Sequence, residues 1–244
     1  MKREPYPVAI LAGGLATRLH PLTHAIPKCL VDVDGQPFVS HQLRLLRDHG
    51  IHRVVLCVGH LGQLVRDQVG AGEAFGLDVD YSEDGGQLLG TAGAIRKALS
   101  KLGEEFFVMY GDSYLPCNFG ELQGVFEARS RPALMAVFRN DGEWDESNVE
   151  FGHGDILAYD KRNPTPRMRY IDCGLGIFRR EIFSTVPDGS PYDLSDLYQC
   201  LLENGSLAAH EVHERFYEIG SFAGLEETRQ YFASRTRLKQ GGLP

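Results

Sequence analysis

The feature that most restricts the fold of this chain is a series of short, nearly continuous apolar runs of strand length. They lie at residues 8–12, 53–58, 77–81, 106–110 and 133–138. Strands that are covered on both faces, as in a parallel sheet, are apolar throughout rather than alternating. Amphipathic segments of helical period separate the runs, at residues 37–49, 91–99 and 118–128. This alternation predicts an α/β fold with a doubly wound, mostly parallel sheet.

The pattern changes in the second half of the chain. Short strands are expected at residues 148–151, 156–159 and 170–178, between turns rich in Gly, Asn and Pro. Two further helices are expected at residues 194–202 and 222–232. A length of 244 residues fits one α/β domain. We therefore expect a single domain over residues 1–244, in which residues 140–244 add a small β-rich extension to the half formed by residues 1–139.

The charge balance of the chain is acidic. A formal net charge of -8 argues against a nucleic-acid binder, because such proteins neutralise phosphates with clustered Lys and Arg. The apolar stretch at the N-terminus ends at Gly13 and Gly14 and is too short for a secretory signal. No apolar run approaches the roughly 20 residues that span a bilayer. We expect a soluble, cytoplasmic protein that binds neither nucleic acid nor membranes.

The cysteines fit the same compartment. There are five of them, an odd number, and no CxxC pair occurs: Cys29, Cys57, Cys117, Cys173 and Cys200. Each lies in or near an apolar run, where a free cysteine behaves as a small hydrophobic residue. We interpret all five as reduced and non-catalytic, which favours the cytoplasm.

The strongest chemical signal is the segment LAGGLATRLHPLTHAIPKCL at residues 11–30. Gly13 and Gly14 follow the first strand directly, and glycines let backbone N–H groups turn toward phosphates without a Cβ clash. Thr17 adds a hydroxyl donor, and Arg18 adds a forked cation suited to phosphate oxygens. Lys28 lies near the end of the same segment. A loop that folds back would place Arg18 and Lys28 on either side of one triphosphate.

This segment resembles the signature of the sugar-phosphate nucleotidyltransferase family, broadly GGxGTRLxPLTxxxPKxL. Three further segments resemble the family in the same order: LGTAGAI (89–95), YGDSYL (110–115) and YEIGS (217–221). The family includes enzymes that make dTDP-glucose, GDP-mannose, GDP-heptose and UDP-N-acetylmuramate. Ala16 stands where the family usually has Gly, and a methyl group is tolerable there if φ is negative. The resemblance implies a Rossmann-like, GT-A-type nucleotidyltransferase fold.

The resemblance also implies roles for the matching positions. Arg18 and Lys28 would be the catalytic cations, with Lys28 beside the reacting phosphates. The nucleotide would be bound by Leu11, Ala12, Gly13, Gly14, Thr17, Arg18, Glu83, Gly90 and Thr91. Of these, the glycines and Thr17 would cradle the triphosphate. Glu83, Gly90 and Thr91 would lie near the base and ribose.

Two acidic residues are candidates for holding Mg²⁺. Asp112 follows the apolar strand at 106–110, and ligands of open α/β sheets bind at the carboxyl ends of strands. Mg²⁺ prefers hard oxygen ligands, usually one or two carboxylates plus phosphate oxygens. The resemblance implies that Glu218 is the second ligand, at a position where the family usually has Asp. Because Glu is longer by one methylene, both direct and water-mediated contact stay open.

Two DxD triplets raise a metal-binding glycosyltransferase as an alternative. Asp32-Val-Asp34 runs into Gly35, and Asp-Gly is a hairpin turn signal. Asp78-Val-Asp80 lies in a strand-like run, where both aspartates point to one face. We interpret the first as a turn and the second as a solvent-facing pair.

The second substrate would meet the second half of the chain. Asn148, Lys161 and Asp172 fall where family members place sugar contacts, so they are candidates for binding a sugar phosphate. The implied reaction transfers a nucleoside monophosphate from a nucleoside triphosphate to a sugar 1-phosphate, with Mg²⁺ as cofactor. A cytidylyltransferase for phosphocholine or a phosphonate stays open, as does a non-catalytic relative that senses nucleotide-sugars. The base, the sugar and any homo-oligomer are not specified.

Overall fold

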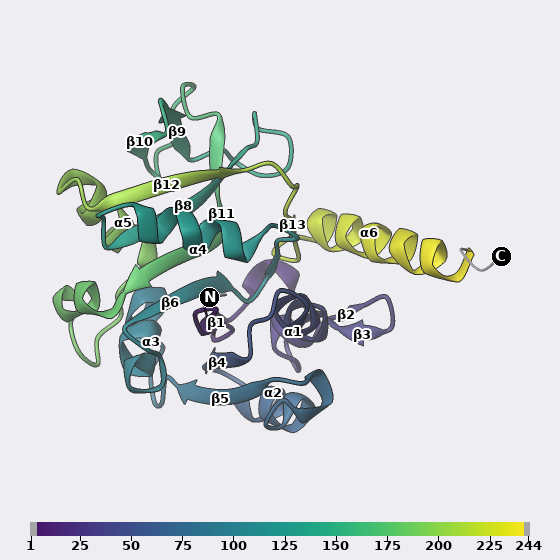
Figure 1. Ribbon diagram of the computed structural model, residues 1–244. Coiled ribbons are helices and arrows are strands. Elements are labelled where there is room, and N and C mark those ends of the chain that lie inside the picture. Colours follow the sequence, from purple (N-terminus) through teal and green to yellow (C-terminus); the bar gives the residue numbers. More distant parts are fainter. Residues whose placement is uncertain (1–3, 242–244) are drawn as a thin grey trace.

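A central nine-stranded sheet organises the molecule (Figure 1). The structure is a computed structural model that describes residues 4–241. The main path of the sheet is β10-β9-β11-β6-β1-β4-β5, and β8 pairs with both β11 and β12. Its strands are β1 (Val8–Leu11), β4 (Arg53–Val58), β5 (Asp78–Glu83), β6 (Glu105–Tyr110), β8 (Ala133–Arg139), β9 (Val149–Gly152), β10 (Asp155–Tyr159), β11 (Tyr170–Arg179) and β12 (Leu207–Val212).

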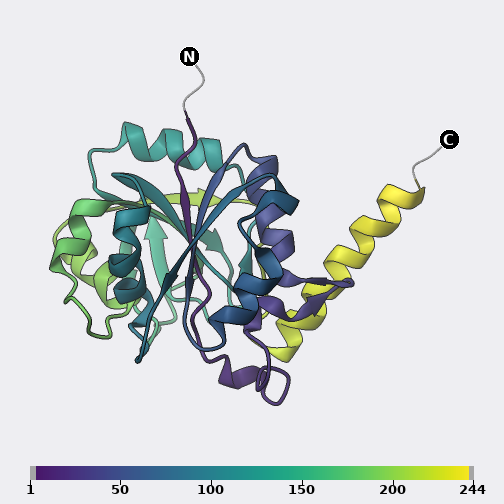
Figure 2. The ribbon, with the colours of Figure 1, turned by 90° about the horizontal axis from the view of Figure 1, so that it is seen from below.

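Helices cover both faces of the sheet (Figure 2). One face carries α1 (Phe38–Asp48), α2 (Gly62–Val69), α4 (Phe119–Ala128) and α6 (Phe222–Gly241). The other carries α3 (Gly90–Ala98) and α5 (Leu194–Glu203). In β1, Val8 and Ile10 enter the first core and Ala9 enters the second, which explains why the strand is apolar throughout. The predicted doubly wound α/β fold is confirmed.

The parallel and antiparallel parts of the sheet meet at β6. Strands β6, β1, β4 and β5 are mutually parallel, so their carboxyl ends form one edge. On the other side of β6, the ten-residue β11 runs antiparallel and also pairs with β8 and β9. The β9–β10 hairpin lies beyond β11 and forms the expected β-rich extension. Strands from both halves of the chain therefore share one sheet.

Both DxD triplets have structural positions that the sequence predicted. The hairpin of β2 (Asp32–Val33) and β3 (Gln36–Pro37) turns at Asp34 and Gly35, with φ of 53° and 76°. Asp78 is exposed at the start of β5, and Asp80 pairs with Lys101 at 2.7 Å. Neither pair of aspartates lines the main cavity described below.

Helix α6 projects from the body (Figure 1) and continues past its predicted end at residue 232. Its packing residues end at Phe232, and the following Ser234 and Arg235 are exposed. The hydrophobic pattern therefore stops before the helix does. Neither α6 nor another helix within residues 4–241 combines the length and apolar character needed to cross a bilayer.

Candidate active site

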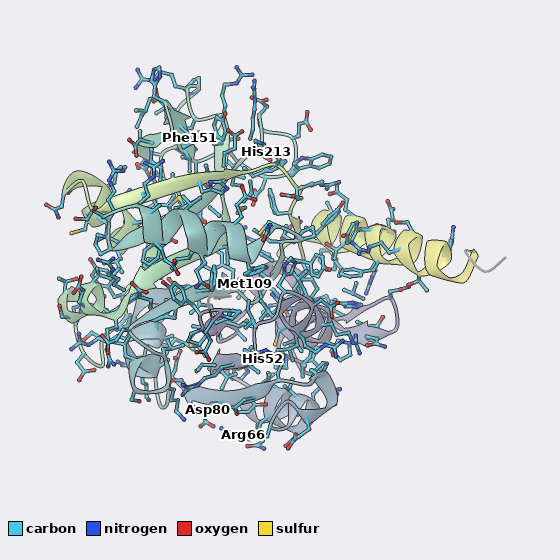
Figure 3. All side chains as sticks on the ribbon, in the orientation of Figure 1. His52, Arg66, Asp80, Met109, Phe151 and His213 are labelled. Atoms are coloured by element: carbon cyan, nitrogen blue, oxygen red, sulfur yellow. The ribbon has the colours of Figure 1, made fainter. Side chains whose placement is uncertain are left out.

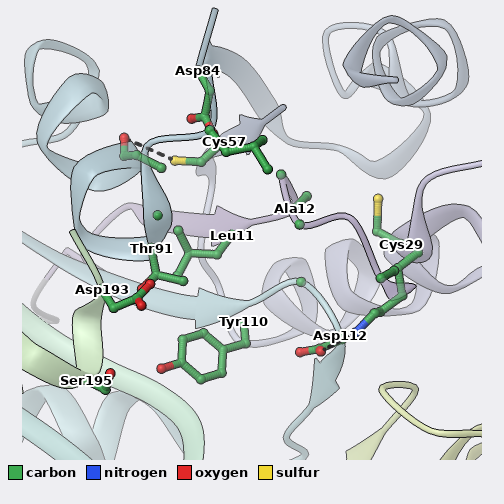
Figure 4. A pocket seen from close by; sticks show the side chains of 18 of the residues that line it. Leu11, Ala12, Cys29, Cys57, Asp84, Thr91, Tyr110, Asp112, Asp193 and Ser195 are labelled. Carbon is green, nitrogen blue, oxygen red and sulfur yellow. Dashed lines mark hydrogen bonds and ion pairs between the residues drawn. The ribbon is translucent and has the colours of Figure 1, made fainter. Parts of the chain in front are cut away.

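A cavity of about 480 Å³ opens at the carboxyl edge of the parallel strands (Figure 4). The end of β1 and the loop after it supply Leu11, Ala12, Gly13 and Gly14 to its wall. The sequence predicted all four as nucleotide-binding residues, and the structure places them together. The cavity continues past the end of β6 toward the start of α5. Its position is the one at which open α/β sheets bind ligands.

Lys28 and Asp112 meet at this cavity. The Lys28 ammonium lies 2.9 Å from Oδ2 of Asp112, and both side chains are partly exposed to the cavity. Gly111 lets the end of β6 approach β1 closely, because a Cβ at Gly111 would lie 2.5 Å from the carbonyl oxygen of Leu11. The pair thus joins the loop after β1 to the residue that follows β6. The arrangement places one cation and one carboxylate at the middle of the strand edge.

Glu218 approaches Asp112 from the C-terminal part of the chain. It lies in β13 (Tyr217–Glu218), which pairs with β7 (Ser113–Tyr114), and the N–H of Ile219 donates to the carbonyl of Asp112 at 2.9 Å. The surroundings of Gly220 show that the carboxylates of Glu218 and Asp112 both approach this residue. A Cβ there would lie 2.5 Å from Oε2 of Glu218 and 3.6 Å from Oδ2 of Asp112.

The pKa of the Glu218 carboxyl is consistent with its closeness to Asp112. Burial raises the pKa of its carboxyl, and the charge of Asp112 raises it further, against hydrogen bonds from Ser221 and the Gly220 N–H. Asp112 lines the cavity and Glu218 lies behind it, where its carboxylate accepts hydrogen bonds from the Gly220 N–H and the Ser221 hydroxyl. Two neighbouring carboxylates are hard oxygen groups of the kind that would hold Mg²⁺. Within residues 4–241, no group of three or more His, Cys, Asp or Glu residues could hold a metal. The fit therefore depends on this pair of carboxylates and on the phosphates of a substrate.

The glycine-rich loop differs from expectation at Ala16. This residue has φ of 52°, so it adopts the left-handed conformation that favours glycine. The expectation that alanine keeps a negative φ here is wrong. Hydrogen bonds within the loop hold this conformation, since the Ala16 carbonyl accepts from the Leu19 N–H at 3.1 Å and from Oγ1 of Thr23 at 2.8 Å.

Thr17 and Arg18 are placed less centrally than Lys28. They begin a short 3₁₀ helix (Thr17–Leu19) in which both side chains are at least partly exposed. Ala16 lines the cavity, but neither of these two residues does. The structure therefore brings Lys28 to the cavity wall and leaves Arg18 at the rim.

Glu83 and its neighbour Asp84 point in different directions. The Glu83 carboxylate pairs with Arg66 of α2 at 2.7 Å, at the outer edge of the sheet where Figure 3 labels Arg66. Among the described residues, Asp84 rather than Glu83 lines the cavity. Successive residues at the end of a paired strand face opposite sides, so only one of these two carboxylates can point to the cavity.

Gly90 and Thr91 line the cavity, as expected, and also connect α3 to α5. A Cβ at Gly90 would lie 2.7 Å from the carbonyl oxygen of Tyr192, and the residue has φ of 69°. The hydroxyl of Thr91 accepts a hydrogen bond from the Leu194 N–H at 2.6 Å. Glycine is therefore required at position 90 by backbone packing.

Lys161 lies on the far side of the cavity in a buried polar network. Its ammonium is 2.8 Å from Oδ2 of Asp172 and 3.2 Å from the hydroxyl of Tyr110. Burial alone would lower the pKa of Lys161, but the Asp172 carboxylate and the nearby tyrosines hold it well above its usual value. Asn148 completes the network, since its Oδ1 accepts from the Asp172 N–H at 3.0 Å.

The three predicted sugar-phosphate residues occupy different positions relative to the cavity. Lys161 lines the cavity, whereas Asn148 and Asp172 are buried behind it. The structure brings all three together, but only Lys161 faces the ligand space. Asp172 and Asn148 position the ammonium rather than form the wall.

Several wall residues were not predicted from the sequence. Two lie inside recognised motifs without having been assigned a role there, and five lie outside them: Cys29 and Tyr110, then Cys57, Asp84, Leu88, Asp193 and Ser195. Asp193 precedes α5 as its N-cap residue, yet its side chain makes no capping hydrogen bond. A helix-start signal in the sequence could have located Asp193, but it could not have shown that the carboxylate faces a cavity.

A family model described as "Nucleotidyl transferase" matches residues 8–234. Among curated proteins, the chain is 28% identical over 213 residues to a UTP–glucose-1-phosphate uridylyltransferase of Synechocystis, covering 80% of this chain and 55% of that protein. It is also 28% identical over 226 residues to an N-acetylmuramate alpha-1-phosphate uridylyltransferase of Neisseria meningitidis, covering 90% of this chain and 95% of that protein. The chain thus spans about half of the first relative and nearly all of the second.

Solved structures show the same fold. HddC from Yersinia pseudotuberculosis complexed with GMP-PN superposes with a TM-score of 0.77 at 23% identity, covering 93% of this chain and 99% of that one. The inositol-1-phosphate CTP transferase from T. maritima gives a TM-score of 0.76 at 20% identity, covering 94% and 97%. At these identities the likeness concerns the fold alone.

Proposed function

Because this chain belongs to the nucleotidyl transferase family, we propose that it transfers a nucleoside monophosphate from a nucleoside triphosphate to a sugar 1-phosphate, releasing pyrophosphate. The observation that carries the proposal is the position of the Lys28–Asp112 pair. It lies in one cavity with the glycine-rich wall of β1 and with Lys161. Two anionic substrates can therefore meet at a single cation.

The names of the relatives support a sugar 1-phosphate as acceptor. The Synechocystis protein is named for glucose 1-phosphate and the meningococcal protein for N-acetylmuramate 1-phosphate. Lys161 supplies the matching group here, a partly buried ammonium at the cavity wall whose pKa the Asp172 carboxylate holds well above its usual value. We assign it to the phosphate of the sugar, with Asp172 and Asn148 as its positioning residues.

The reaction that fits these groups is an in-line displacement at the α-phosphorus. A phosphate monoester is already an anion near neutral pH, so it attacks without a general base. Catalysis then requires alignment of two anions and neutralisation of the charge that develops between them. Lys28 is placed for that neutralisation, and Gly13 and Gly14 leave room for phosphates along β1. Thr17 and Arg18 would contact the triphosphate from the rim.

Asp112 and Glu218 would hold the metal ion that this chemistry uses. A bound Mg²⁺ would offset the negative charge of the phosphates. The two carboxylates support this assignment because both approach Gly220. The four buried free cysteines fit a reducing compartment, so we also place the protein in the cytoplasm.

The test is a pyrophosphate-release screen with Mg²⁺. ATP, CTP, GTP, UTP and dTTP are each paired with a panel of sugar 1-phosphates, with phosphocholine and with a phosphonate. We expect release only with a sugar 1-phosphate, and its loss in Lys28→Ala. If pyrophosphate were released only with phosphocholine or the phosphonate, that compound and not a sugar 1-phosphate would be the acceptor substrate. If substrates bound but no pair released pyrophosphate, a sensing protein would be favoured.

A further inference from the structure

Asp84 places a carboxylate at the end of the cavity opposite Asp112 (Figure 4). It directly follows β5, and its N–H continues the ladder by donating to the Val58 carbonyl at 3.0 Å. Asp112 follows β6, and the strand order β6-β1-β4-β5 separates the two by three strand spacings. At about 4.8 Å per spacing, the ends of the two strands lie about 14 Å apart.

Backbone and apolar groups form the cavity wall beside Asp84. A Cβ at Gly13 would lie 3.1 Å from the Gly59 nitrogen and 3.5 Å from Oδ2 of Asp84. A Cβ at Gly59 would lie 2.7 Å from the Gly13 carbonyl oxygen and 3.0 Å from Cδ2 of Leu88. Gly13 therefore lies next to the carboxylate, and Leu88 lines the same cavity. A planar ring can pack against such a wall, because glycine backbone and one aliphatic side chain form it.

The carboxylate of Asp84 lacks a cationic partner among residues 4–241. Its Oδ2 accepts the Leu89 N–H at 3.3 Å, and no ion pair joins the side chain to a described Lys, Arg or His. Lys97 bonds instead to the backbone carbonyl of Asp84, at 3.0 Å. Burial raises the pKa of Asp84, against the Leu89 hydrogen bond and the charge of Lys97. A partly buried carboxylate that no described cation pairs with directly is a group that a ligand with donors can satisfy.

The hydrogen-bonding edges of the bases differ in a way that a carboxylate detects. An ionised carboxylate only accepts hydrogen bonds and binds two parallel donors best. Guanine alone presents two adjacent donors, N1–H and the N2 amino group. Uracil and thymine flank one donor with two carbonyl oxygens, whereas adenine and cytosine place a ring acceptor beside their amino group. Those oxygens and ring nitrogens repel the carboxylate.

We infer that Asp84 is the base-reading residue of this chain and that it selects guanine, so that GTP is the nucleotide substrate. The inference rests on the proposed function, because it assumes that the cavity holds a nucleotide with its phosphates at Lys28. It assigns the specificity to Asp84 rather than to Glu83, whose carboxylate is taken by Arg66 on the other side of the strand end.

The experiment compares kcat/KM for GTP and UTP in the wild type and in Asp84→Asn. Asparagine keeps an oxygen that can accept the Leu89 N–H, but it adds a donor. An amide with one donor and one acceptor complements uracil, which presents both. The matched control is Asp78→Asn at the exposed start of the same strand. Glu83→Gln tests the neighbouring carboxylate.

We expect the wild type to prefer GTP over UTP, CTP, ATP and dTTP by at least about tenfold, and Asp84→Asn to lower the GTP/UTP ratio by about tenfold or more. The ratio should be unchanged in Asp78→Asn. A wild-type preference for another base, an unmoved ratio in Asp84→Asn, or a shift produced by Glu83→Gln alone would overturn the inference. Those outcomes leave the proposed function intact. If none of the five triphosphates supported any activity, the proposed function itself would be contradicted.

Discussion

The ammonium of Lys28 lies 2.9 Å from the carboxylate of Asp112, although 84 positions separate them in the chain. The contact exists because β1 and β6 are parallel neighbours, with Leu11 opposite Tyr110 at their carboxyl ends. The loop after β1 then returns Lys28 to the edge from which Asp112 emerges. The relationship gives the cavity a cation and an acidic ligand at the same place, and it is the basis of the first two predictions.

Replacing Lys28 by alanine should lower kcat by at least about 100-fold, because it removes a fixed positive charge from the transferring phosphates. The measurement is the initial rate of pyrophosphate release at saturating substrates. Lys101→Ala is the matched control, since that ammonium pairs with Asp80 on β5, outside the cavity. A folded Lys28→Ala protein with a near-wild-type rate would remove Lys28 from the reacting centre.

Asp112→Asn should raise the Mg²⁺ concentration for half-maximal rate by at least about tenfold, because an amide oxygen replaces a charged ligand. Asp34→Asn and Asp80→Asn should leave that concentration unchanged, since those residues lie in a hairpin turn and on an outer strand. The comparison is a Mg²⁺ titration of the rate for all three variants. A metal defect in either DxD variant, with none in Asp112→Asn, would favour the glycosyltransferase alternative.

Glu218 should respond to both length and charge. Glu218→Asp retracts the carboxylate by about 1.5 Å, one C–C bond, which Mg²⁺ tolerates poorly. We therefore expect a higher Mg²⁺ requirement in Glu218→Asp and a still higher one in Glu218→Gln, relative to the exposed control Glu226→Gln. If Glu218 holds only a metal-bound water, Asp is neutral and Gln mildly harmful. Three superimposed titration curves would show that Glu218 has no part in metal binding.

Asp172→Asn should make the use of the sugar 1-phosphate sensitive to alkaline pH. In the wild type, the pKa of Lys161 lies well above its usual value, so the ammonium stays charged as pH rises. Without the Asp172 charge, burial lowers that pKa, and the charged fraction falls with rising pH. We expect kcat/KM for the sugar 1-phosphate to drop between about pH 7 and pH 9 in this variant but not in the exposed control Asp67→Asn on α2. Parallel pH profiles would contradict a positioning role for Asp172.

Ala16→Gly should be neutral or stabilising. A left-handed alanine costs about 1–2 kcal/mol, and glycine removes this strain while adding about 0.5–1 kcal/mol of chain entropy to lose on folding. The free energy of unfolding should therefore rise by up to about 1.5 kcal/mol. Ala74→Gly, at an exposed position without a positive φ, should be destabilising instead. Equal destabilisation in both variants would show that Ala16 is not strained.

The sequence by itself determined the elements with strong local patterns. Strand β4 and helix α1 could be predicted closely, because the spacing of apolar residues reflects which faces are buried. Helix α2 and strand β12 were not predicted. Helix α2 is short and starts after Leu61 in a left-handed conformation without a capping side chain, and β12 is specified by its pairing with β8. A strand that is specified by pairing with a distant segment need not show an apolar periodicity in its own sequence.

The motifs likewise predicted which residues gather at the site, but only the tertiary structure decided what each of them faces. Gly13 and Asp112 were predictable because each comes two residues after a strand that ends at one edge, and Lys28 because it belongs to the same motif as Gly13. That Asp84 rather than Glu83 faces the cavity could not be predicted, because the direction of a side chain at a strand end depends on how far the strand is paired. Nor could the burial of Asp172 behind Lys161, which arises where the long strand β11 crosses behind the cavity. The spacing of motifs along the chain determines which residue types come near the carboxyl edge of the strands. The orientation and burial of each side chain there are determined by the packed sheet.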